Sequence, residues 1–139
     1  MKTIFYIAII LIGTLSSCLT DKKHKEITTD MIENPTKIEF INNKYDFGKI
    51  AVGSSLEHTF KFKNSGNTDL IIHSVQAQCG CTVPENWPKH PISPGEEGEI
   101  RVVFNPNNSQ KNVNKYIAVI ANTRPANTKL YSTGDVIGN

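Results

Sequence analysis

Apolar and polar residues alternate with a period of two along most of the chain beyond residue 36. In the clearest run, Phe60 and Phe62 alternate with Lys61 and Lys63. Such alternation points every second side chain to the same face, which is typical of a strand with one buried face. Further runs of this kind include Ile38 and Phe40, Leu70 and Ile72, Ile100 to Phe104, Ile117 and Val119, and Leu130 with Val136. The pattern predicts about seven short strands.

Clusters of Asn, Gly, Pro and Ser separate these runs at intervals of about ten residues. They occur at 42–43, 64–67, 94–95 and 105–108. No stripe of apolar residues at helical spacing persists long enough for a globular helix. The fold class predicted is all-β, an immunoglobulin-like antiparallel β-sandwich. Its expected core consists of Phe47, Phe60, Phe62, Leu70, Ile72, Ile100, Val102, Phe104, Ile117, Val119 and Val136.

Three of the turns lead to specific expectations. Residues 64–67 are expected to form a hairpin-type turn between two strands, because Asn and Gly tolerate left-handed backbone geometry. Gly48 is expected to end a short strand at positive φ. Pro94-Gly95 fits the central positions of a type II turn, which would lead into a strand from Glu99 to Phe104.

The first 18 residues follow a different pattern. Lys2 precedes an apolar segment of 12 residues, Ile4 to Leu15, which is too short to cross a bilayer and is typical of a secretory signal. The segment ends in Leu15-Ser16-Ser17-Cys18, the kind of site at which a lipoprotein is processed. We therefore predict a signal peptide at 1–17 and a lipid on Cys18; the alternative is an ordinary signal peptide in which Cys18 has no role.

Composition divides the remainder into a tether and one domain. Residues 18–35 show no sustained period and are expected to be a flexible tether behind the lipidated cysteine, whereas 36–139 has the size of a single β-sandwich domain. This organisation predicts a lipid-anchored protein of the bacterial cell envelope. The absence of Asp after Cys18 favours the outer membrane, with the domain facing the periplasm or the cell surface.

Charge and motifs exclude several classes of function. Without residues 1–17 the chain keeps 14 Lys and Arg against 13 Asp and Glu, a nearly neutral balance that offers no basic face for nucleic acid. It contains no nucleophile elbow, phosphate-binding loop or dinucleotide-binding turn. The sequence thus predicts no catalytic residues and no cofactor. The histidines lack the spacing of a metal site, so His58 and His73 are expected at packing or surface positions.

The sequence leaves open the chemical role of one motif, the two cysteines of Cys79-Gly80-Cys81. Export would place both thiols outside the cytoplasm, where a disulfide can form, and a bridge across one residue would be a small, strained ring. Three interpretations remain: a passive pair or inert clip, a redox pair, or a soft-metal site that His73 or His90 could complete.

Several boxes together resemble a known family. They are similar to those of domain-of-unknown-function family 1573, which is found largely in lipoproteins of the Bacteroidetes. The boxes are the run Tyr45 to Ile50, CGCT at 79–82, PGE at 94–96 and Asn122-Thr123. The resemblance covers about residues 37–136 and implies an immunoglobulin-like sandwich similar to Hydin-like and major-sperm-protein-like modules, with no known reaction. Residues 132–134 depart from the family pattern, which has an apolar residue before the glycine.

Two classes of function follow from the sequence. The first is a non-enzymatic binding or scaffolding module that is anchored to the membrane through Cys18 and presents loops or a strand edge to another envelope protein. The second is an envelope protein that handles electrons or soft metals through Cys79 and Cys81. We favour the first, because only the cysteine pair supports the second.

Overall fold

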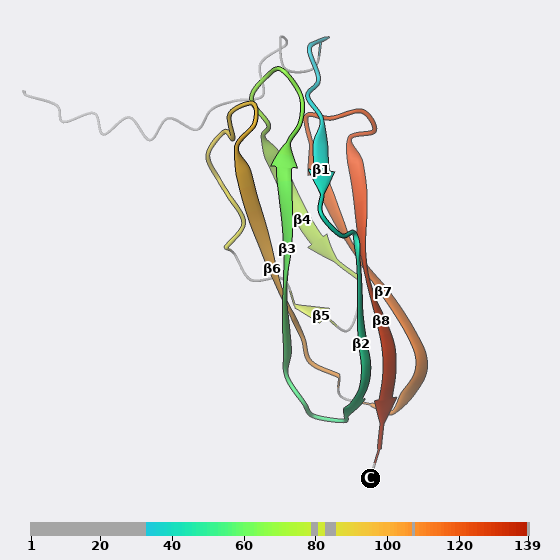
Figure 1. Cartoon of the computed structure of the whole chain (residues 1–139). Coiled ribbons are helices and arrows are strands. Elements are labelled where there is room, and N and C mark those ends of the chain that lie inside the picture. The colour runs from blue at the N-terminus through green and yellow to red at the C-terminus, as the bar shows by residue number, and fades with distance from the viewer. Residues whose placement is uncertain (1–32, 79–80, 83–85, 107, 139) are drawn as a thin grey trace, which may run out of the picture.

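The computed structural model describes residues 33–78, 81–82, 86–106 and 108–138. This part of the chain folds into strands arranged as two layers (Figure 1). Among these residues no helix is long and apolar enough to cross a membrane. The strands are β1 (Ile38–Phe40), β2 (Lys44–Ala51), β3 (Leu56–Asn64), β4 (Ile72–Ala77), β5 (Cys81–Thr82), β6 (Glu97–Phe104), β7 (Gln110–Ala121) and β8 (Asn127–Ile137).

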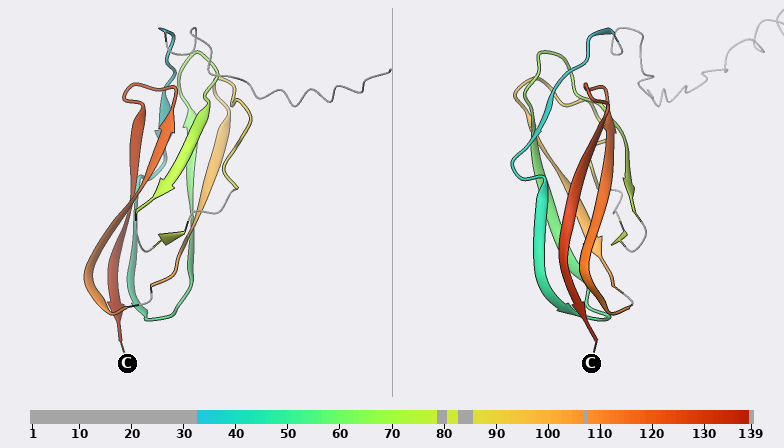
Figure 2. Two further views of the ribbon diagram at one scale, coloured as in Figure 1. Left: turned by 180° about the vertical axis from the view of Figure 1, so that it is seen from behind. Right: turned by 90° about the vertical axis from the view of Figure 1, so that its right-hand side faces the viewer.

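The strands form two four-stranded sheets, in the orders β1-β3-β6-β5 and β2-β8-β7-β4 (Figure 2). The β-sandwich predicted from the alternation is confirmed. One pair departs from the expected antiparallel arrangement, since β2 runs parallel to β8. The chain leaves the first sheet after β1 and enters the second as β2, and there it meets the last strand in the same direction.

The core lies between the two sheets. Ten of the eleven predicted core residues are buried, and Ile92 and Leu130 are fully enclosed beside them. Phe47 is the exception. It is half-buried and stacks on Phe104 with ring centroids 5.1 Å apart, in a second small cluster with Val113 and Val136.

The segment at 64–67 is not a hairpin. It follows β3 of the first sheet and leads toward β4 of the second, so it carries the chain across the sandwich. On the way, Leu70 forms an isolated bridge with Ile92, and β4 begins only at Ile72. The local sequence correctly predicts a turn at 64–67. Contacts between distant segments, however, decide which strands pair with each other.

Two glycines have the positive φ angle that the sequence predicts. Gly48 has φ +65° and Gly95 has φ +83°. However, β2 does not end at Gly48: it continues to Ala51 past a bulge between Asp46 and Lys49. The strand that follows Gly95 begins at Glu97, two residues earlier than expected.

Residues 132–134, where the family pattern expects an apolar residue before the glycine, lie within β8. Ser132 and Thr133 pair with both neighbouring strands, whereas Gly134 pairs with β7 and faces the bulge of β2. A Cβ atom at Gly134 would lie 2.4 Å from ring carbons of Phe47, so the missing side chain makes room for that ring.

A stacked pair of ring side chains connects the two sheets. The ring of Tyr45 on β2 lies parallel to His58 on β3, with centroids 3.7 Å apart, and His58 meets the edge of Phe60. His58 is therefore a packing residue, as expected. Burial removes water from the imidazole and lowers its pKa below the ordinary value of 6.5.

This environment predicts a loss of stability in acid. Below about pH 6.5 the unfolded chain protonates His58 more readily than the folded chain, so the free energy of unfolding should fall from pH 7 to pH 5. Urea unfolding of the wild type and of His58→Gln at both pH values checks this. The variant should lose less stability on acidification; an identical loss in both proteins would contradict the assignment.

Candidate functional site

The structure leaves the predicted site cysteines largely untested. Cys18 and Cys79 lie outside the described residues. The backbone of Cys81 begins β5 and pairs with Phe104 of β6, which places it at the edge of the first sheet. Lipidation at Cys18 and the chemistry of the cysteine pair therefore stay predictions.

The histidines do not gather around a metal position. His73 is exposed on β4, and His90 is exposed in the connection before β6. Within the described ranges no group of three or more His, Cys, Asp or Glu side chains could hold a metal ion. Neither histidine is brought to a described metal site.

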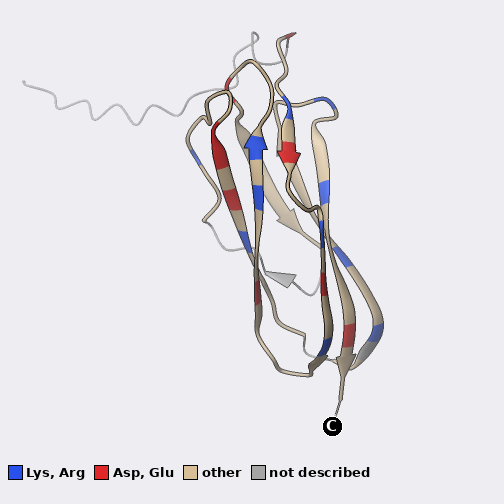
Figure 3. Ribbon diagram, viewed as in Figure 1, with Lys and Arg blue, Asp and Glu red and all other residues tan. Residues whose placement is uncertain are grey.

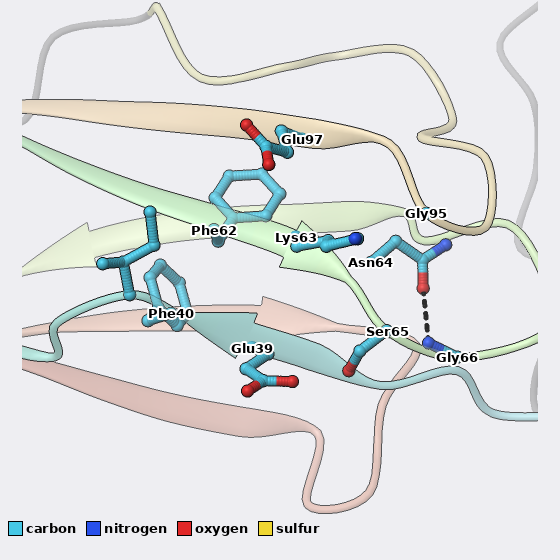
Figure 4. Close-up of a pocket in the computed structure, with 10 residues that line it drawn as sticks. Glu39, Phe40, Phe62, Lys63, Asn64, Ser65, Gly66, Gly95 and Glu97 are labelled. Atoms are coloured by element: carbon cyan, nitrogen blue, oxygen red, sulfur yellow. Dashed lines mark hydrogen bonds between the residues drawn. The ribbon is translucent and has the colours of Figure 1, made fainter.

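A groove of about 620 Å³ lies along β1, at the end of the sandwich opposite the C-terminus (Figures 1 and 4). Strands β1, β3 and β6 contribute its walls, and the turns at Ser65-Gly66 and Gly95 close its upper end. The ten lining residues include charged, apolar and small side chains. They are Glu39, Phe40, Ile41, Phe62, Lys63, Asn64, Ser65, Gly66, Gly95 and Glu97.

Asn64 forms the rigid base of this groove. It is 0% exposed, and both ends of its amide are satisfied. Its Oδ1 accepts hydrogen bonds from Thr36 Oγ1 at 2.8 Å and Gly66 N at 3.1 Å. Its Nδ2 donates to the carbonyls of Thr68 at 2.8 Å and Ile92 at 2.9 Å. One side chain thereby joins the segment before β1 to the two loops beside the groove.

A second asparagine holds the start of β1 to the other sheet. Asn122 accepts a hydrogen bond from Ile71 N at 2.8 Å and donates to the carbonyl of Asp69 at 2.9 Å. Its own carbonyl accepts from Thr36 N at 2.9 Å. Because Thr36 contacts both asparagines, the position of β1 is determined from both sheets.

The turn residue Asn64 was not expected to be buried. A signal was present, because Asn64 continues the alternation of Phe60 and Phe62 and so points inward. A buried asparagine needs up to four hydrogen-bond partners, and distant segments supply them here.

Charged side chains form a row across the groove. Glu39, Lys63 and Glu97 are cross-strand neighbours on β1, β3 and β6 (Figures 3 and 4). No ion pair within 4.0 Å joins them in the described part of the chain. Farther along the same face, by contrast, Arg101 and Glu57 approach to 3.0 Å. The row therefore presents two carboxylates and one ammonium to solvent.

Apolar surface adjoins this row. The ring of Phe40 lies 5.5 Å from the buried ring of Phe62, and Phe40 itself is half-buried. Ile41, the next residue, is 68% exposed. Apolar and charged side chains thus lie side by side along the groove.

The two packed sheets define an immunoglobulin-like β-sandwich. The chain belongs to the family described as Protein of unknown function (DUF1573), whose model matches residues 38–136. The resemblance seen in the sequence boxes is thus confirmed, and the description of the family assigns it no function. A comparison with curated protein sequences gives no match.

Solved structures share the fold. A protein of unknown function from Porphyromonas gingivalis W83 is 18% identical with a TM-score of 0.60; the alignment covers 72% of this chain and 46% of that one. This chain thus spans less than half of that protein. The PapD-like domain 7 of human CEP192 is 16% identical with a TM-score of 0.56, covering 76% and 88%. The VesB protease of Vibrio cholerae is 12% identical with a TM-score of 0.53, covering 77% and 33%. These likenesses concern the fold alone.

Proposed function

We propose that the protein is a non-enzymatic binding module of the bacterial cell envelope, attached to the outer membrane by lipid on Cys18, with its domain facing the periplasm or the cell surface. The groove along β1 carries this proposal, because it places the exposed Ile41 beside the unpaired charges of Glu39 and Glu97. Such a surface suits another protein better than a small substrate. The partner is an envelope protein.

The tether complements this arrangement. Residues 18–35 lead directly to β1, and 18 residues reach at most about 60 Å when fully extended. The groove would then lie at the end of the domain nearest the anchor, where partners in or on the same membrane are within reach.

Replacing Cys18 with Ala tests the anchor. We expect the variant to remain an unprocessed precursor that takes up no labelled fatty acid, because no other residue at that site can carry a thioether-linked lipid. Metabolic labelling and membrane fractionation measure this. Ser17→Ala, one residue earlier, should be processed and acylated normally. Acylation of the Cys18→Ala protein would contradict the assignment.

Photo-cross-linking in living cells tests the binding module. A benzophenone side chain at Ile41 should yield a discrete adduct with an envelope protein, because this position borders the groove. The matched control is Val52, which is also apolar and 39% exposed but lies near the C-terminal end, where its N–H donates to the carbonyl of Ile137. Equal adducts at both positions, or none at Ile41, would refute the proposal.

A further inference from the structure

In the described part of the chain, strand β1 lies at the edge of its sheet and pairs with β3 alone. Its hydrogen bonds to β3 include Ser65 N donating to the carbonyl of Lys37 at 2.9 Å. At the other end, Ile41 N donates to the carbonyl of Lys61 at 3.0 Å. In an antiparallel pair, residues bonded to the partner alternate with residues whose N–H and C=O point the opposite way. These two hydrogen bonds therefore show which residues of β1 direct their backbone N–H and C=O groups toward β3.

From that register, Ile38 and Phe40 direct their backbone groups away from β3, while Glu39, which lies between them, faces Lys63. In the described part of the chain no strand pairs with this outer edge of β1. Two N–H groups and two carbonyls thus form a short template for another strand.

The side chains of the same edge are incompletely covered. Ile38 and Phe40 pack against the main core but remain half-buried, and Ile41 is 68% exposed. Strand β1 has three residues, whereas β3 beside it has nine, so β1 runs along only part of β3. A strand added outside β1 would bury these three side chains further.

The charges indicate which strand would fit. Glu39 is the one charged side chain of the three-residue strand β1, and in the described part of the chain it forms no ion pair within 4.0 Å with its neighbour Lys63. A basic side chain next to Glu39 would be attracted by it, whereas an acidic one would be repelled.

We propose that the outer edge of β1 accepts an extended peptide segment of the partner protein as an additional antiparallel strand. Apolar residues of that segment contact Ile38 and Phe40, and a basic residue lies beside Glu39. Backbone hydrogen bonds provide the attachment, and the alternating side chains provide the selectivity. This inference rests on the proposed function, because it specifies how the module binds its partner at the strand edge that adjoins the groove.

The backbone part of the proposal is tested with a probe peptide of eight alternating valine and lysine residues, acetylated and amidated. It is titrated into the ¹⁵N-labelled full chain in detergent. The amide signals of Ile38 and Phe40 should shift saturably and become protected from exchange, while those of β4, an edge strand of the other sheet, should not. N-methylation of alternate peptide amides should abolish binding. Binding that survives N-methylation, shifts confined to other strands, or no binding would overturn the proposal.

The charge part is tested with Glu39→Lys, for which we expect about fivefold to tenfold weaker binding of the lysine peptide, the size of a surface charge effect. Glu99→Lys on the same sheet is the matched control and should change the affinity less than about twofold. Equal effects of both variants would overturn the assigned orientation. Self-association of the protein through β1, seen as a dimer in sedimentation, would assign the edge to a second copy instead.

The two proposals fail separately. If the Ile41 probe captures an envelope protein while the peptide does not engage the β1 backbone, the binding module stands and strand addition is wrong. If the peptide binds at β1 and no protein is captured in cells, the outer edge of β1 can accept a strand but the proposed function is wrong.

Discussion

Asn64→Ala is expected to lower the free energy of unfolding by about 3–5 kcal/mol. The substitution removes four hydrogen bonds of the buried amide. Gly66 N loses its acceptor, whereas the carbonyls of Thr68 and Ile92 keep one donor each, Thr36 Oγ1 and Leu70 N. Each lost hydrogen bond contributes about 0.5–1.5 kcal/mol net. Because small domains are stable by only about 5–15 kcal/mol, the loss is a large part of the total.

Urea unfolding followed by the fluorescence of Trp87, the single tryptophan, measures this effect, since the indole packs against the main core. Ser65→Ala is the matched control: Ser65 is the exposed neighbour in the same turn and should change stability by less than about 0.5 kcal/mol. A loss below about 1 kcal/mol in Asn64→Ala would show that Asn64 does not hold the loops together.

Phe60→Ala is expected to cost a further comparable amount, about 3–5 kcal/mol, for a different reason. Phe60 is 1% exposed in the main core and meets the edge of His58 at 4.6 Å. Removing its ring loses apolar burial and leaves a cavity that the two sheets cannot close. The same unfolding experiment measures it.

Ile41→Ala provides the contrast for Phe60→Ala. It removes a large apolar side chain that is 68% exposed, so stability should change by less than about 0.5 kcal/mol. If Ile41→Ala were as damaging as Phe60→Ala, Ile41 would belong to the core and the groove would lose its main apolar contact.

The sequence predicts the strands and the core well because both depend on local alternation. Phe60, Phe62, Ile100 and Val102 point inward for the same reason that their neighbours point outward, and no distant residue is needed to see it. The backbone conformation of a glycine is similarly local, as the positive φ angles of Gly48 and Gly95 confirm.

The arrangement of the strands is harder to predict from the sequence, because it depends on which sheet each strand joins. Nothing within residues 64–67 indicates that they cross the sandwich, or that β2 pairs in parallel with β8. The groove has the same origin. Glu39, Lys63 and Glu97 are far apart in the sequence, and only the register of β1, β3 and β6 places them in one row.

Cross-linking at Ile41 in the Cys79→Ser, Cys81→Ser variant tests most directly whether the groove or the cysteine pair carries the function. Cells with wild-type cysteines and cells with the double variant carry the same benzophenone probe, and adducts are compared by mass spectrometry. The groove-based account predicts the same envelope partner in the same yield. Loss of the adduct, together with thiol-dependent electron exchange or Cu(I) uptake by the wild type alone, would contradict it and assign the function to the cysteines.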